Sequence, residues 1–194
     1  MNIWHDIDEK RISKDSFISV IEIPKGGKNK YELDKETGRL LLDRILHTAT
    51  HYPANYGFIP RTYGEDKDPL DVLVICQEQI LPLTLVETYP IGVLIMVDQD
   101  ERDEKIIAIP KKDPYLNMYK DISEVPTHVS AEIMHFFEVY KQLERKSIVV
   151  EQMLGREEAE RIIQKSMDAY KEQGFRSRRI GDKGHIMIEE RKNG

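Results

Sequence analysis

The chain has 194 residues, of which 40% are hydrophobic and 33% charged, a composition typical of one globular domain and not of a disordered chain. Its net charge of -6 argues against a general nucleic-acid binder, because phosphate contacts need a basic face. No apolar run approaches the ~20 residues of a membrane span, and the first ten residues lack the apolar core of a signal peptide. The single cysteine, Cys76, cannot form an intrachain disulfide, which favours a reducing cytoplasm.

Short strands separated by turns are predicted over the first two-thirds of the chain. The first strand is Phe17 to Ile23, which is rich in β-branched residues and stops at Pro24. Residues 25–30 (KGGKNK) predict a turn, and the stretch DKETG predicts a hairpin between strands at 31–33 and 39–43. Three further apolar runs, each bounded by Pro, Gly or acidic residues, predict strands at 72–75, 91–97 and 105–109.

The last third of the chain changes to a helical period. One apolar face runs through Val129, Ile133, Phe136, Phe137, Tyr140 and Leu143. Pro126 and Thr127 suit the start of that helix, and a second helix is expected over about 157–173. Many short strands followed by two helices predict a small closed β-barrel with helices against it. Residues 175–194 predict either an arm that packs on a neighbour or a frayed terminus.

Two acid-rich segments lie at ends of predicted strands. EDKDPLD, residues 65–71, precedes an apolar strand, and DQDERDEK, residues 98–105, follows one. If both ends meet at one mouth of a barrel, the carboxylates raise one another's pKa unless a cation compensates, and Mg²⁺ prefers such oxygen ligands. Solvated loops are the simpler interpretation of the second segment. Pro69 stiffens the first segment, EDKDPLD, between its acidic residues, which favours a binding site there over a solvated loop.

Lysine, arginine and tyrosine side chains on other predicted elements could bind an anion. They are Lys30, Arg44, Tyr52, Tyr56, Lys105, Tyr140 and Lys141. Singly, each suits an ordinary surface or core-edge position. Together with the acids they predict a site for metal ions and phosphate.

These segments resemble the family I soluble inorganic pyrophosphatases. The stretches that carry the resemblance are VIEIPKGGKNKYELDKETGRLLLDR, HYPANYGFIP, EDKDPLDVLV, IGVLIMVDQDERDEKIIAIP and HFFEVYKQLE, in family order over about 17–174. The resemblance implies an α+β, mostly β fold: an OB-type five-stranded barrel with flanking α-helices. It implies one domain over 1–194, with 175–194 as an extension. It also implies hydrolysis of pyrophosphate to two orthophosphates with several Mg²⁺ ions.

The resemblance assigns the metal ligands by position. Asp66, Asp71 and Asp103 match the ligands of the principal metal, and Asp71 matches a bridge to a second. Asp98 and Asp103 match the ligands of a further metal that arrives with substrate. Glu32 matches a residue near another substrate-borne ion.

The resemblance also implies the remaining roles. Asp68 matches the catalytic residue that takes a proton from a water between metals. Glu22 matches an outer acid, and Tyr52 matches a tyrosine one layer behind the binding groups. The residues that match the phosphate-binding set are Lys30, Arg44, Tyr56, Lys105, Tyr140 and Lys141.

Two other functions and the assembly state stay open. An OB-shaped barrel can bind nucleic acid, but that function needs a basic groove, which the acidic segments contradict. A non-catalytic metal or phosphate binder would keep the same ligands and lack turnover. A homo-oligomer is expected, with a hexamer favoured over a dimer or trimer. Val139 stands where bacterial hexameric members usually carry a histidine, so a histidine contact there is not expected.

Overall fold

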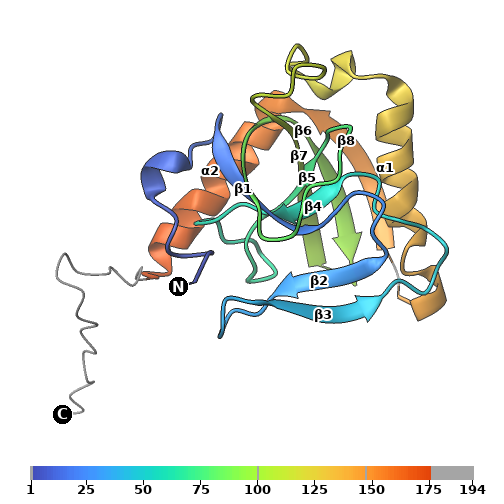
Figure 1. Cartoon of the computed structure of the whole chain (residues 1–194), viewed down its shortest axis with the longest axis horizontal. Helices are drawn as coiled ribbons and strands as arrows, with labels where there is room; N and C mark the ends of the chain where they lie inside the picture. The colour runs from blue at the N-terminus through green and yellow to red at the C-terminus, as the bar shows by residue number, and fades with distance from the viewer. Residues whose placement is uncertain (1, 100, 147, 176–194) are drawn as a thin grey trace.

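Five strands close into a ring. The structure, a computed structural model, describes residues 2–99, 101–146 and 148–175. The ring strands are β1 (Phe17–Ile23), β4 (Asn55–Phe58), β5 (Asp71–Val74), β7 (Glu101–Pro110) and β6 (Leu85–Asp98), in that order, and β6 pairs back to β1 (Figure 1). β8 (Ile148–Gly155) extends the sheet along β6. The predicted OB-type barrel is confirmed; the segment 176–194, predicted as an arm or frayed terminus, lies outside the described residues.

Strand pairing brings the two acidic segments to one place. β5 and β7 run parallel, and their register sets Asp71 opposite Lys105. β6 and β7 form an antiparallel hairpin whose last pair is Asp98 with Glu101. A separate hairpin of β2 (Asn29–Leu33) and β3 (Leu40–Ile45) lies beside the ring and pairs Lys30 with Arg44 (Figure 1).

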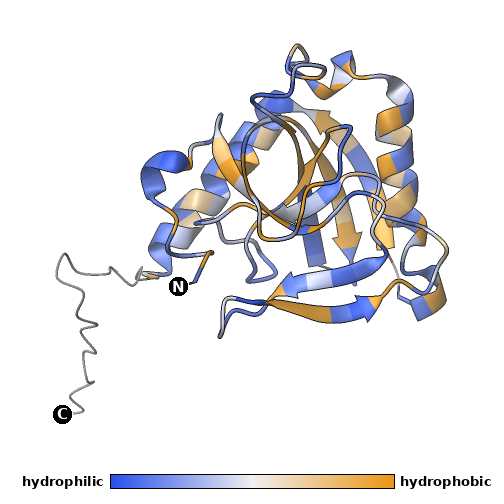
Figure 2. Cartoon of the chain, viewed as in Figure 1, coloured by the Kyte–Doolittle hydropathy of each residue, from blue (hydrophilic) through white to orange (hydrophobic). Residues whose placement is uncertain are grey.

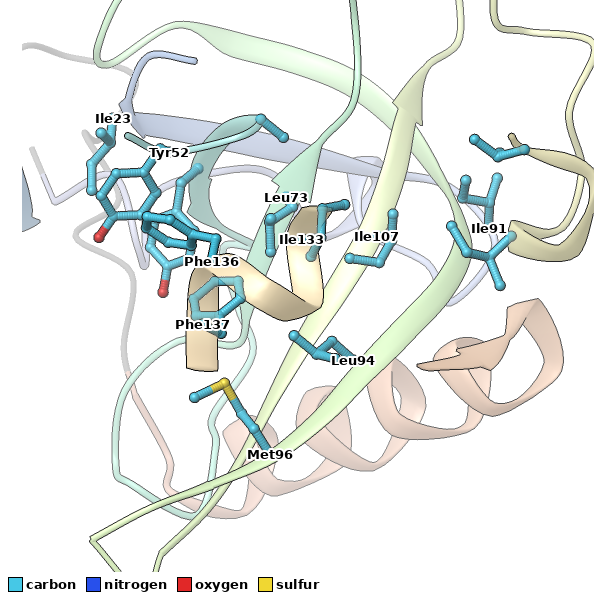
Figure 3. Close-up of a cluster of buried hydrophobic side chains, with 14 of the residues drawn as sticks. Ile23, Tyr52, Leu73, Ile91, Leu94, Met96, Ile107, Ile133, Phe136 and Phe137 are labelled. Atoms are coloured by element: carbon cyan, nitrogen blue, oxygen red, sulfur yellow. The ribbon is translucent and has the colours of Figure 1, made fainter. Parts of the chain in front are cut away.

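The strands are apolar on both faces, which explains their unbroken hydrophobic runs. In β5, Leu73 belongs to one buried cluster, whereas Val72 and Val74 belong to another. The first cluster includes Ile133, Phe136 and Phe137 of α1 (Thr127–Val139; Figure 3). The second cluster includes Ala159, Ile162 and Ile163 of α2 (Arg156–Glu172). Both helices are amphipathic, as the mixed colours along them in Figure 2 show. No helix in the described part of the chain is long and apolar enough to cross a membrane.

The two predicted helices are present, but the first ends early. α1 covers Thr127–Val139 and α2 covers Arg156–Glu172. The prediction that the helical face continues to Leu143 was wrong: that side chain is exposed and lies in a separate 3-10 turn, Gln142–Glu144. Tyr140 and Lys141, which directly follow the helix, are both buried.

Two strands were not predicted from the sequence. β4 has four residues and contains Gly57, whose missing side chain lets β4 approach β1: a Cβ there would lie 1.8 Å from the Val20 carbonyl oxygen. β8 has no regular alternation of buried and exposed residues, because its pairing with β6 shifts register between Val150 and Gln152. The short helical turns Glu9–Arg11 and Ile122–Glu124 complete the elements of the described residues.

Candidate active site

One cavity of about 220 Å³ gathers the predicted site residues at the mouth of the barrel. Every one of them lines it except Arg44 and Tyr52. The acids on its wall are Glu22, Glu32, Asp66, Asp68, Asp71, Asp98 and Asp103. The cationic and phenolic groups are Lys30, Tyr31, Lys35, Tyr56, Lys105, Tyr140 and Lys141. The strands therefore bring the two acidic segments and the cationic set together.

Lys105 lies at the centre of the carboxylates. Its ammonium nitrogen is 2.5 Å from Asp71 Oδ2 and 2.6 Å from both oxygens of Asp103. It also lies 5.7 Å from the centroid of the Tyr56 ring and 5.9 Å from that of Phe137. Burial alone would lower the pKa of Lys105, but Asp103 and Asp71 outweigh burial and raise it well above its usual value. Lys105 is therefore a fixed positive charge.

Asp71 begins β5 and connects the loop to the barrel. Its Oδ2 accepts hydrogen bonds from Lys105 and, at 2.5 Å, from the hydroxyl of Tyr56. Burial, followed by the charges of Asp71 and Asp103, raises the pKa of the Tyr56 hydroxyl well above 10, so it stays a donor. Because Asp71 is tied to a buried strand, its carboxylate has a fixed position in the cavity.

The loop before β5 is shaped by its own backbone. The N–H of Asp68 donates to Asp66 Oδ1 at 3.0 Å, and the N–H of Gly64 donates to the carbonyl of Asp68 at 2.7 Å. Lys67 adopts the left-handed conformation, with φ of 68°. These bonds turn the carboxylates of Asp66 and Asp68 toward the cavity that both line.

Gathered acids raise one another's pKa, as the residue pattern predicts. Burial, then Asp71 and Asp103, raises the pKa of Asp66 to about 6. Burial, then Asp71, raises the pKa of Glu22 to about 8, although its Oε1 accepts a 2.7 Å hydrogen bond from the N–H of Leu33. Burial also raises the pKa of Asp103, against the charge of Lys105. The cavity therefore holds more negative charge than its lysines compensate.

The far wall comes from the end of α1 and from β2. The Lys141 ammonium contacts Asp98 Oδ2, and burial lowers the pKa of Lys141. Lys30 contacts Glu32 within β2 and lies 3.3 Å from Asp43. Lysines of separate elements thus line the same cavity as the acids, and an anion with several charged oxygens requires several such donors.

Arg44 and Tyr52 lie behind the cavity wall. Arg44 donates from Nε to Glu144 at 2.9 Å, and its buried Nη2 has no hydrogen-bond partner among the described residues. Tyr52 is buried and packs its ring 5.3 Å from that of Tyr56. Lys35, by contrast, lines the cavity and was not predicted, because a lysine in a hairpin turn carries no distinguishing pattern.

The donor set fits hard cations. Within the described ranges, no three His, Cys, Asp or Glu side chains already stand in ligating geometry; the Lys105 ammonium contacts Asp71 and Asp103 instead. Two buried carboxylate oxygens, Asp98 Oδ1 and Asp68 Oδ1, make no hydrogen bond there, although the second is in ion-pair contact with Lys35. Carboxylate oxygens in excess of nearby cations are the ligands that Mg²⁺ and similar ions prefer. This arrangement can bind metal ions together with a polyanion.

Comparisons with known proteins find relatives over most of the chain. The family model described as inorganic pyrophosphatase matches residues 19–171. Soluble inorganic pyrophosphatase 2 of Chlamydomonas reinhardtii is 48% identical over 169 residues, which cover 87% of this chain and 88% of that protein. Soluble inorganic pyrophosphatase 1 of Arabidopsis thaliana is 49% identical over 169 residues, 87% of this chain and 80% of that one.

Solved structures of related bacterial proteins share the fold. The crystal structure of an inorganic pyrophosphatase from Thermus thermophilus aligns with a TM-score of 0.83 at 38% identity, covering 87% of this chain and 99% of that one. A structure of the Helicobacter pylori inorganic pyrophosphatase aligns with a TM-score of 0.80 at 42% identity, covering 88% of this chain and 98% of that one. Sequence and fold comparisons therefore point to the same group of proteins.

Proposed function

The chain belongs to the inorganic pyrophosphatase family, and from that premise we propose that it hydrolyses pyrophosphate to two orthophosphates with Mg²⁺ as its cofactor. The family consists of metal-dependent hydrolases. The observation that carries the proposal is the cavity in which carboxylates of two acidic segments face lysines from three other elements.

In this proposal the carboxylates of Asp66, Asp71, Asp98 and Asp103 hold the metal ions, and Glu32 lies near an ion carried in with substrate. Bound Mg²⁺ supplies charge that offsets the phosphate oxygens and lowers the pKa of a coordinated water toward neutrality. Asp71, the first residue of β5, would hold an ion from a position that the strand fixes. Glu22, behind these ligands, holds the end of β2 through Leu33.

The proton and the leaving phosphate are handled by other side chains. Asp68 stands on the cavity wall with its side chain 46% exposed, where it can accept the proton of the attacking water. Lys30, Lys141, Tyr56 and Tyr140 line the cavity around it, and they would bind phosphate oxygens and stabilise charge as the P–O bond breaks. Lys105 and Arg44 complete this set, and Tyr52 supports Tyr56 from behind.

Orthophosphate release from pyrophosphate, measured with and without Mg²⁺, tests the proposal. We expect multiple turnovers that require the ion and stop on chelation. Binding of Mg²⁺ and phosphate without turnover, across Mg²⁺, Mn²⁺ and Zn²⁺, would contradict it and would support the alternative of a non-catalytic binder.

Three further properties are proposed on separate grounds. A cytoplasmic location is supported by the free, buried thiol of Cys76. We propose a homo-oligomer, with a hexamer favoured; an assembly is supported by Leu41, Leu42 and Ile45 on β3, which are exposed. One domain over 1–194 is supported by the single sheet of β1, β4, β5, β7, β6 and β8, which has a buried cluster on each face. Light scattering would decide the assembly state.

A further inference from the structure

Lys35 connects the cavity to an aromatic cluster outside it. Its ammonium pairs with Asp68 Oδ1 and lies 5.9 Å from the centroid of the Trp4 ring. Its carbonyl accepts a 3.0 Å hydrogen bond from the side-chain amide of Asn2. Both its backbone and its charged end are therefore held by the N-terminal segment.

Trp4 is itself fixed by several contacts. The side chain is 4% exposed, and its Nε1 donates to the carbonyl of Thr62 at 3.0 Å. Its ring packs against those of His5 at 4.5 Å and Phe175 at 5.3 Å. His5 Nδ1 lies 2.7 Å from the hydroxyl of Tyr170, at the end of α2. A cation above such a ring has a defined place.

The same tryptophan also supports the loop that carries Asp68. The hydroxyl of Thr62 accepts a 2.8 Å hydrogen bond from the N–H of Leu70, two residues beyond Asp68. The carbonyl of Trp4 accepts a 3.0 Å bond from the N–H of Arg61. Trp4 thus fixes the base of the loop, and Lys35 fixes the carboxylate at its tip.

An ordinary surface ion pair is the simpler interpretation, because the side chains of Lys35 and Asp68 are 51% and 46% exposed. Two facts count against it. Both side chains line the cavity. The lysine is also held at its backbone and over an aromatic ring, so its placement does not depend on the pair alone.

We propose that Lys35 is a positioning residue that acts through Asp68, and that Trp4 holds Lys35 in place. The inference rests on the proposed function, in which Asp68 accepts the proton. Without the lysine, the carboxylate is free to rotate away from the attacking water. The loss therefore falls on kcat, since the phosphate-binding and metal-binding groups keep their places.

A double-mutant cycle separates this role from a structural one. Lys35→Met should lower kcat by about tenfold or more with KM within about twofold, and Lys35→Arg should recover most of the loss because it keeps the charge. In an Asp68→Asn background, Lys35→Met should change kcat by less than about twofold. Equal losses in both backgrounds, or a loss mainly in KM, would overturn the proposal.

The matched control is Lys165→Met. Lys165, on α2, pairs at 2.7 Å with Glu65 of the loop that carries Asp68. Both side chains are exposed, and Lys165 does not line the cavity. This variant should keep kcat within about twofold. A loss equal to that of Lys35→Met would show that any pair on the loop has the effect, which overturns the specific role of Lys35.

The tryptophan is tested by Trp4→Leu, with circular dichroism to verify folding. It should lower kcat in the wild type, and lower it by a smaller factor in the Lys35→Met background, where only the support of the loop base through Thr62 is left to lose. A further loss of full size in the Lys35→Met background would overturn the placement of Lys35 by Trp4. A wild type that hydrolyses no pyrophosphate would instead contradict the proposed function, so the two failures are distinguishable.

Discussion

Replacing Lys105 by Met tests whether an ammonium holds the acidic cavity together before metals bind. Lys105 is 4% exposed and contacts Asp71 and Asp103 at 2.5–2.6 Å. Methionine has a similar shape and no charge, so the variant leaves the two carboxylates, and Asp66 beside them, without that counter-ion. The loss is expected to be largest when no metal ion is present.

The magnitude follows from the contacts. At these separations and an effective dielectric of about 20, each ammonium–carboxylate pair is worth roughly 6 kcal/mol before desolvation. Desolvation cancels much of this, and removing one partner of a buried pair costs about 3–5 kcal/mol. The cost shrinks as the pH falls, because Asp66, whose pKa is raised to about 6, then takes up a proton and loses its charge.

Urea unfolding of wild type and Lys105→Met, in chelator and in excess Mg²⁺, measures the effect. The variant should lose about 3–5 kcal/mol of unfolding free energy at pH 7.5 in chelator, and less than half of that in Mg²⁺ or at pH 5. Lys165→Met, which breaks the exposed pair with Glu65, should lose at most about 1 kcal/mol. An equal loss for Lys105→Met with and without Mg²⁺ would refute the reasoning.

Three other substitutions have defined outcomes. The pKa of Glu22 is raised from 4.5 to about 8 in the folded protein. Its contribution to the stability of the metal-free protein is therefore full below about pH 4.5 and is lost as the pH rises through 8. Glu22→Gln should therefore flatten the pH dependence of unfolding between pH 5 and 8, by up to roughly 3–4 kcal/mol; parallel curves would contradict this. Gly57→Ala should cost about 3 kcal/mol or more in a thermal melt, because the new Cβ meets the Val20 carbonyl at 1.8 Å; an unchanged Tm would be inconsistent with the β1–β4 contact. Tyr56→Phe removes the 2.5 Å bond to Asp71 and should lower kcat/KM about tenfold; wild-type kinetics would exclude a role for that hydroxyl.

The strands that the sequence predicts well are those with buried residues on both faces. Residues 17–23 form β1 with the predicted bounds, and the run at 72–75 overlaps β5. The four residues of β4 give too short a pattern, and its Gly57 is needed for a contact with a distant strand. The helix that starts at Thr127 was extended too far, since Leu143 is in phase with the helical face although the chain has already turned.

The acids of the site were predictable because their density next to apolar strands is unusual. Asp66 and Asp71 in one segment and Asp98 and Asp103 in another line a single cavity, as two strand ends of one barrel allow. Lys35 was not predictable from a pattern. Its importance depends on a hairpin that brings it to Asp68 and on a tryptophan 31 positions earlier in the sequence.

The most direct test of the central claim is orthophosphate release from pyrophosphate at saturating Mg²⁺ by Asp71→Asn, compared with Asp168→Asn as a surface control. Asp168 lies on α2, with its side chain 54% exposed, and does not line the cavity. We expect Asp71→Asn to fold but to lose about 10³-fold or more in kcat/KM, while the control retains wild-type activity. Near-normal turnover by Asp71→Asn would contradict a reaction centred on the carboxylates of this cavity.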